Sequence, residues 1–158
     1  MKIGIIADTH DNLPQIKRAV DFFNKEKVSY VLHAGDYIAP FALTVLEKLN
    51  CPWQGVFGNN DGEKKGLSER SGGKITTAPL EISLGKKNIC VVHSLGNTGE
   101  LPGKKYDAVI SGHTHKIEIK KNGTTIFINP GECGGWLYGE SSVVIWDTDK
   151  LEAKGHKL

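Results

Sequence analysis

The sequence lacks several features that would assign the chain to a special class. It has only three cysteines, an odd number without C-x-x-C spacing, which favours reduced thiols over a disulfide framework. No apolar stretch approaches the ~20 residues that span a bilayer. Met1-Lys2 leads directly into an apolar run, so we expect no signal peptide. The net charge is only +2, so we expect no specific binding of nucleic acid through a broad basic face.

The remaining composition is that of an ordinary globular protein. Hydrophobic residues make up 39% of the chain and charged residues 24%. The length of 158 residues suits one compact domain, and no internal repeat is visible. We therefore expect a cytoplasmic protein with a single domain over residues 1–158 and no membrane partner.

The first half of the chain alternates between strand and helix patterns. Short apolar runs predict strands at 2–7, 28–33 and 53–57. The segments between them predict helices at 13–25 and 40–49, the first with its N-cap at Asp11 or Asn12. This alternation predicts a parallel βαβαβ unit with right-handed crossovers.

The second half consists mostly of short strand patterns. The predicted strands are 80–84, 88–92, 108–111, 117–120, 124–128 and 142–147, with hairpin turns at 85–87 and 121–123. Residues 62–77 are polar and lack apolar periodicity, which predicts a mobile surface loop. We expect His156 to be solvated in a charged tail. Together the halves predict an α/β fold of two stacked mixed β-sheets flanked by helices.

Five of the apolar runs end in side chains of the metal-binding kind. These residues are two carboxylates, one amide and four imidazoles: Asp8, His10, Asp36, Asn59, His93, His113 and His115. Loops beyond the carboxyl ends of strands meet in one crevice of an open α/β sheet. The set is large enough for two divalent ions, with Asp36 best placed to bridge them. Mixed nitrogen and oxygen ligands favour Mn²⁺, with Ni²⁺, Fe²⁺ or Zn²⁺ as alternatives, over Mg²⁺.

The ordered motifs D-x-H, G-D, G-N-N-D, H and G-H-T-H resemble the calcineurin-like metallophosphoesterase family. They are most similar to its small bacterial and archaeal phosphodiesterase branch, and the likeness runs from Met1 to about Trp146, including the turn at 129–132. The resemblance implies a two-sheet sandwich with the metals at the sheet edge. It also implies that Asp8, His10, Asp36 and His115 hold one ion, and that Asp36, Asn59, His93 and His113 hold the other. A hydroxide bridging the two ions would then attack the phosphorus of a small phosphoester in line.

The chain departs from the family pattern at two positions. Asn60 stands where many members carry a histidine, and an amide donates a hydrogen bond but transfers no useful proton. A further histidine often follows two residues after His93, where this chain has Leu95. Asn60 and Asp61 are the candidate catalytic residues, and the Asn60 amide can donate a hydrogen bond to a phosphoryl oxygen. For Asp61 two roles stay open: a loop cap, or a group that orients the site.

Several alternatives remain open from the sequence. A diester is the preferred substrate class, because a monoester often calls for a guanidinium clamp and Arg70 is the only plausible candidate. A phosphomonoesterase, a protein phosphatase and a non-catalytic scaffold similar to the retromer subunit are the alternatives. The intact ligand set argues against a scaffold. Lys64, Lys65 and Arg70 either contact substrate or are simply solvated, and residues 134–138 either form a partner surface or pack on the protein.

His33, inside a predicted strand, is expected to be a hydrogen-bonded structural histidine. The natural substrate, the physiological metal and the oligomeric state, including a homo-oligomer, stay open.

Overall fold

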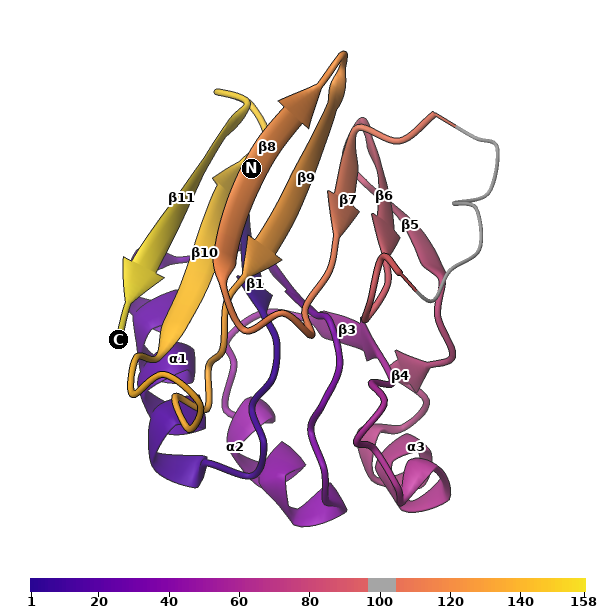
Figure 1. The fold of residues 1–158 in the computed structure, drawn as a ribbon, viewed down its shortest axis with the longest axis vertical. Helices are drawn as coiled ribbons and strands as arrows, with labels where there is room; N and C mark the ends of the chain where they lie inside the picture. Colours follow the sequence, from indigo (N-terminus) through magenta and orange to yellow (C-terminus); the bar gives the residue numbers. More distant parts are fainter. Residues whose placement is uncertain (97–104) are drawn as a thin grey trace.

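The computed structural model describes residues 1–96 and 105–158, which form two β-sheets and a layer of helices. The strands of the first sheet are β1 (Lys2–Ile6), β2 (Tyr30–His33), β3 (Trp53–Val56), β4 (Ile75–Thr76), β10 (Ser142–Asp147) and β11 (Glu152–Lys157). Their order is β11-β10-β1-β2-β3-β4 (Figure 1). Strands β1, β2 and β3 run parallel, as the βαβαβ pattern predicts; β4 continues the parallel order, and β10 and β11 are antiparallel.

The second sheet is built from the C-terminal half of the chain. Its strands are β5 (Leu80–Leu84), β6 (Lys87–Val91), β7 (Ala108–Ile110), β8 (Ile117–Asn122) and β9 (Thr125–Pro130). They lie in the order β5-β6-β7-β9-β8, with β6, β7 and β9 parallel and both edge strands antiparallel. Both sheets are therefore mixed, and the predicted fold class is confirmed.

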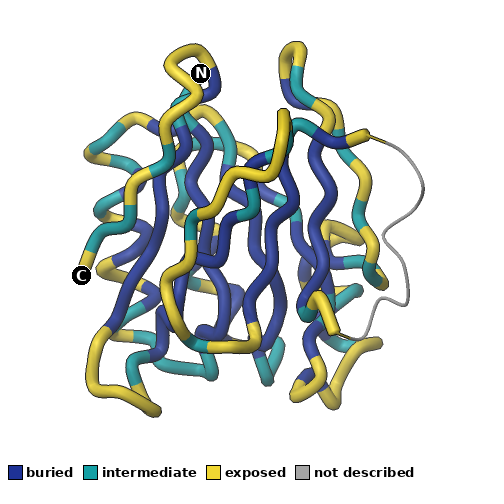
Figure 2. Tube along the Cα trace, turned by 45° about the horizontal axis from the view of Figure 1, so that its top comes forward, coloured by how far each residue is buried: buried dark blue, intermediate teal, exposed yellow. Residues whose placement is uncertain are grey.

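The two sheets pack face to face over a shared apolar core. Ile3 and Ile5 of β1 belong to the same buried cluster as Val91 of β6 and Ile110 of β7. Figure 2 shows these central strands as continuous buried segments. Because β1 is buried on both faces, it reads in the sequence as an unbroken apolar run rather than an alternating one.

The helices lie on the other face of the six-stranded sheet (Figure 1). They are α1 (Leu13–Glu26), the 3₁₀ turn η1 (Pro40–Ala42), α2 (Leu43–Leu46) and α3 (Lys64–Ser71). The Asn12 side chain accepts a hydrogen bond from the backbone N–H of Gln15 and so caps α1. Among the described residues, none of the helices has both the length and the apolarity that a bilayer crossing requires.

The segment 62–77 is not the surface loop that its composition predicts. It forms α3 and β4, and Leu67 of α3 is fully buried beneath the helix. One buried leucine in an eight-residue helix produces no apolar periodicity, so the pattern looks like a loop. The segment is a structural part of the core.

Three smaller expectations also need correction. The predicted helix 40–49 is the 3₁₀ turn η1 followed by the single turn α2. The hairpin predicted at 121–123 turns later, because β8 continues to Asn122. The charged tail is the edge strand β11, and the ring of His156 lies 4.9 Å from the ring of Phe22, so it is only partly exposed.

Candidate metal centre

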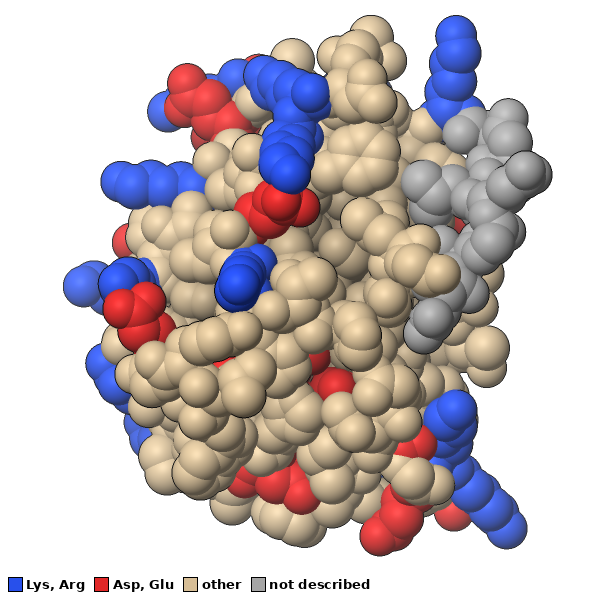
Figure 3. All heavy atoms as spheres, in the orientation of Figure 1, with Lys and Arg blue, Asp and Glu red and all other residues tan. Residues whose placement is uncertain are grey.

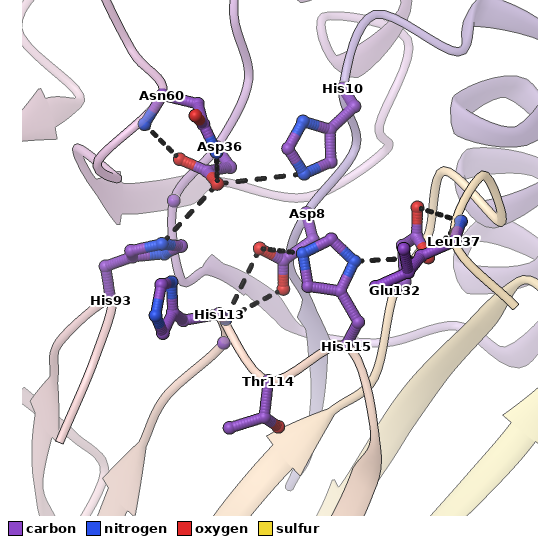
Figure 4. Close-up of polar contacts among 12 residues, drawn as sticks. Asp8, His10, Asp36, Asn60, His93, His113, Thr114, His115, Glu132 and Leu137 are labelled. Atoms are coloured by element: carbon purple, nitrogen blue, oxygen red, sulfur yellow. Dashed lines mark hydrogen bonds and ion pairs between the residues drawn. The ribbon is translucent and has the colours of Figure 1, made fainter. Parts of the chain in front are cut away.

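The side chains that the sequence singles out as ligands come together where strands of both sheets end. Four follow β1, β2 and β3 of the six-stranded sheet: Asp8, His10, Asp36 and Asn59. Three follow β6 and β7 of the five-stranded sheet: His93, His113 and His115. Figure 4 shows the carboxylates and histidines of this cluster with loops of both sheets around them. The site thus lies across the junction of the two sheets.

One group of possible ligand atoms consists of Asp8, His10 and His115, all within 4.8 Å of one another. The rings of His10 and His115 stack with their centres 5.3 Å apart, and His115 Nε2 lies 3.8 Å from Asp8 Oδ1. His10 Nε2 is buried without a hydrogen-bond partner and lies 3.7 Å from Asp36 Oδ2. A buried, unpaired ring nitrogen is unfavourable, and a bound cation would satisfy it.

The second group consists of Asp8, Asp36 and His93, again within 4.8 Å. His93 Nδ1 lies 2.8 Å from the backbone oxygen of Ala34, which only accepts, so Nδ1 carries the proton. In the neutral ring, Nε2 then has a lone pair, and it faces Asn59 Oδ1 at 2.8 Å and Asp36 Oδ2 at 3.5 Å. Three acceptors that face one another fit a cation between them.

Asp36 lies between the two groups, as Figure 4 shows. Its Oδ2 atom is 3.7 Å from His10 Nε2 and 3.5 Å from His93 Nε2. The residue common to both groups is Asp8. Asn59 Oδ1 lies 2.9 Å from His113 Nδ1, which brings that ring to the second group as well. The geometry therefore brings all seven predicted ligands together.

The cluster is electrostatically unbalanced on its own. Burial, and after it the neighbouring carboxylate of Asp36, raise the pKa of Asp8 to about 8. Burial lowers the pKa of His10; nearby Asp36 opposes this, and His115 adds to it. Both effects disfavour the charged forms of side chains that lie within reach of each other. A divalent cation would reverse the effect on the carboxylates.

Two glycines allow the loops of the site to approach closely. A Cβ atom at Gly35 would lie 2.7 Å from His93 Nδ1, and one at Gly112 would lie 2.8 Å from the Cβ atom of Ala7. Both distances are below what packed atoms tolerate. Gly35 also has a φ of +99°, which other residues rarely adopt. These two glycines therefore leave room for the backbone to approach closely beside the site.

Asp61 holds two of the ligand loops together. Its buried carboxylate accepts hydrogen bonds from the backbone N–H groups of Asp36, Tyr37, Ile38 and Gly58 at 2.7–3.2 Å. The loop after β2 is thereby tied to the loop after β3. This arrangement makes Asp61 a positioning residue and combines the two roles that the sequence left open.

Asn60 contacts a ligand directly. Its backbone N–H donates to Asp36 Oδ1 at 2.9 Å, and its amide Nδ2 donates to Asp36 Oδ2 at 2.7 Å. The residue is exposed, so it lies on the solvent side of the buried Asp36 carboxylate. Asn60 therefore fixes the orientation of the Asp36 carboxylate from the open side of the site.

Glu132 is a residue of the site that the sequence did not single out. Its carboxylate is buried, and Oε2 lies 3.2 Å from His115 Nδ1, at ion-pair distance but not aligned for a hydrogen bond. In Figure 4 it stands on the side of His115 away from Asp8. The sequence signal is weak: an acidic residue after the Asn129-Pro130-Gly131 turn. That turn lies beside the site, because Asn129 Nδ2 donates to the backbone oxygen of Gly112 at 2.7 Å.

His33 and Arg70 make structural contacts. His33 is buried, with Nε2 3.2 Å from Thr9 Oγ1 and Nδ1 accepting from Gly35, so it is the structural histidine expected. Arg70 forms an ion pair with Glu47 through two nitrogen atoms. It is not a free guanidinium clamp.

Comparison with known proteins agrees with this geometry. The profile of the calcineurin-like phosphoesterase superfamily domain matches residues 1–151. A protein of *Methanocaldococcus jannaschii* named Phosphodiesterase MJ0936 is 37% identical over 159 residues, covering 96% of each chain.

Comparison with solved structures agrees with the family match. The structure of an archaeal phosphodiesterase matches with a TM-score of 0.88 and 34% identity, covering all of both chains. The phosphoesterase YfcE of *E. coli* has the same fold, with a TM-score of 0.75 at 21% identity over 100% of this chain and 98% of that one. The chain is therefore an enzyme of the calcineurin-like phosphoesterase superfamily.

Proposed function

We propose that the chain is a phosphodiesterase that works with two divalent metal ions, Mn²⁺ above all. One ion would be held by Asp8, His10, Asp36 and His115, and the other by Asp36, Asn59, His93 and His113. The observation that carries this proposal is the convergence of possible ligand atoms in two groups that share Asp8, together with the buried, unpaired Nε2 atom of His10. Histidine nitrogens mixed with carboxylate oxygens suit Mn²⁺ better than Mg²⁺.

Two divalent ions at this position would make hydroxide available at neutral pH and offset negative charge on the phosphoryl oxygens. The protein's own charges do not attract a phosphate there. On the face drawn in Figure 3, Lys and Arg side chains lie around the margin and over the left part of the face, and a few acidic atoms are visible near the centre. The chain's own contribution is positional: Asn60 orients Asp36, and Asp61 fixes the loops.

The preference for a diester is supported by the arginines and by the relatives. Arg70 is paired with Glu47, and Arg18 donates to Gln15 on α1, so both guanidinium groups are engaged elsewhere. A dianionic monoester is commonly gripped by a guanidinium group, whereas a diester monoanion needs less positive charge. The relative from *M. jannaschii* carries the name phosphodiesterase.

The test is hydrolysis by chelated protein to which single metals are returned. Bis(4-nitrophenyl) phosphate and 4-nitrophenyl phosphate serve as the diester and the monoester. We expect Mn²⁺ to restore diester hydrolysis better than Mg²⁺, and the diester to react faster than the monoester. Equal rescue by Mg²⁺ at matched saturation would overturn the ligand model. A faster monoester would indicate a phosphomonoesterase, and neither bound metal nor turnover would indicate a scaffold.

A further inference from the structure

Three consecutive large hydrophobic residues lie exposed between β9 and β10. Trp136, Leu137 and Tyr138 are 67%, 61% and 53% exposed. Single exposed apolar residues are common, but a contiguous group usually marks a surface that binds something. Of the two roles the sequence left open for this segment, packing on the protein therefore does not describe these side chains.

The segment is rigidly attached although its side chains are exposed. The backbone N–H groups of Trp136 and Leu137 donate to the buried carboxylate of Glu132 at 2.8 and 3.1 Å. Trp136 Nε1 donates to the backbone oxygen of His10 at 3.1 Å. The N–H of Gly134 donates to the backbone oxygen of Asp8 at 2.9 Å. An exposed indole held in this way is preorganised for binding.

The segment borders a cavity that opens beside the metal centre. The cavity has a volume of about 260 Å³ and is lined by His10, His115, Glu132, Trp136 and Leu137. Its two histidines are candidate metal ligands, so the cavity is continuous with the site. No lysine or arginine lines it, and its one carboxylate already accepts bonds from the backbone. A second phosphate is therefore a poor occupant.

We propose that Trp136 and Leu137 form a subsite for a planar, uncharged aromatic group carried by one ester oxygen of the diester. The inference rests on the proposed function, because a phosphoryl group held near His10 and His115 would direct one ester group into this cavity. The indole offers a flat face for stacking. A second copy of the chain fits less well, since stable interfaces use about 20–30 residues on each side.

The first experiment compares two diesters with the same leaving group. Bis(4-nitrophenyl) phosphate and methyl 4-nitrophenyl phosphate differ only in the group that would occupy the subsite. In Trp136→Ala we expect the ratio of their kcat/KM values to fall about tenfold, the scale of aromatic stacking on a ring. Leu137→Ser should lower the ratio less, and Trp136→Phe should keep most of it. Leu151→Ser is the matched control, because Leu151 is 48% exposed and lies at another cavity.

A second measurement follows binding without turnover. Phenylphosphonate and methylphosphonate contain P–C bonds that the enzyme does not hydrolyse. Trp53 and Trp146 are buried, so quenching of fluorescence by acrylamide reports mainly on Trp136. In the Mn²⁺-loaded enzyme, phenylphosphonate should shield the indole from acrylamide, and methylphosphonate should not.

The outcomes separate this inference from the proposed function. If Trp136→Ala slows both diesters equally, the indole only supports His10 and the subsite does not exist. If the variant turns a dimer into a monomer with an unchanged ratio, the surface is an interface between copies. If no diester reacts, the proposed function fails, while shielding by phenylphosphonate still decides whether the aromatic subsite exists.

Discussion

Asp36 lies within 3.7 Å of a histidine nitrogen from each candidate ligand group, so its substitution should affect the site strongly. Asp36→Asn keeps the shape of the side chain and removes its charge. Losing a residue that only supports a ligand typically costs 10–100-fold in metal affinity, and we expect at least about 100-fold here, with loss of activity. The measurement is Mn²⁺ affinity and diester turnover. Asp21→Asn, an exposed acid on α1, is the control, and wild-type turnover in Asp36→Asn would place the bridging ligand elsewhere.

The amide at Asn60 leads to a prediction about the leaving oxygen of the ester. Because an amide supplies no proton, we expect wild type to cleave aryl esters well and alkyl esters poorly. Asn60→His should then gain more on poor leaving groups than on good ones, within the ~10²–10⁴-fold range of general acid catalysis. A leaving-group series for both proteins measures this.

Asn60→Ala is the control for this series, because it removes the hydrogen bond to Asp36 without adding an acid. If the wild-type rate is independent of leaving-group pKa while chemistry is rate-limiting, another group already supplies the proton. The role given to Asn60 would then be wrong.

Glu132 should act on the metal through His115. Glu132→Gln removes the negative charge 3.2 Å from His115 Nδ1 and keeps an oxygen for the backbone of Trp136. We expect Mn²⁺ affinity to fall about tenfold, as for other groups that support a ligand. Titration with Mn²⁺ provides the measurement. Glu26→Gln, which breaks an ion pair with Lys2 at the end of α1, should leave the affinity unchanged. If the two variants lowered Mn²⁺ affinity equally, Glu132 would have no specific role in metal binding.

At the scale of elements, α3 should contribute to stability through one residue. Leu67 is fully buried among the helices and the six-stranded sheet. Leu67→Ala should lower the free energy of unfolding by about 2–5 kcal/mol, as expected for a cavity in a packed core. Urea denaturation measures the change, and the exposed Lys65→Ala should remain within about 0.5 kcal/mol of wild type. If Leu67→Ala changes the free energy of unfolding only slightly, residues 62–77 would behave as the surface loop that their composition predicts.

The elements that were predictable are those whose burial leaves a clear pattern. The strands β1, β2 and β3 are short apolar runs, and each ends at a ligand that the sequence shows directly. The helix α3 was missed because a single leucine is buried. The edge strand β11 was missed because its charged, half-exposed residues resemble a tail.

The residues of the candidate site could likewise be predicted only in part. Its ligands stand out because each follows a strand. Glu132 does not stand out in the sequence, because its role depends on contacts with His115 and with the backbone of Trp136. Only the folded chain creates these contacts.

At the scale of the whole molecule, the ligands link the two sheets. Asp8 and Asp36 follow strands of one sheet, and His93 and His115 follow strands of the other. Metal binding should therefore stabilise the entire fold. At a Mn²⁺ concentration of 100 Kd the gain is about 2.7 kcal/mol, which corresponds to a rise in Tm of about 5–10 °C. Thermal unfolding with and without Mn²⁺ measures this. Asp36→Asn should lose most of the rise, and an equal rise in that variant would mean that Mn²⁺ binds elsewhere.

The backbone at the site has a consequence over evolutionary time. Five ligand residues have φ values between 42° and 69°: Asp8, His10, Asp36, His113 and His115. Residues other than glycine adopt this left-handed conformation at some cost, although asparagine, aspartate and histidine do so more often than the rest. In a lineage that no longer needed the reaction, substitution of these residues by glycine or asparagine would relieve the strain and would not be selected against. The strands that precede them carry no such conflict. Descendants would keep the architecture long after the chemistry had gone.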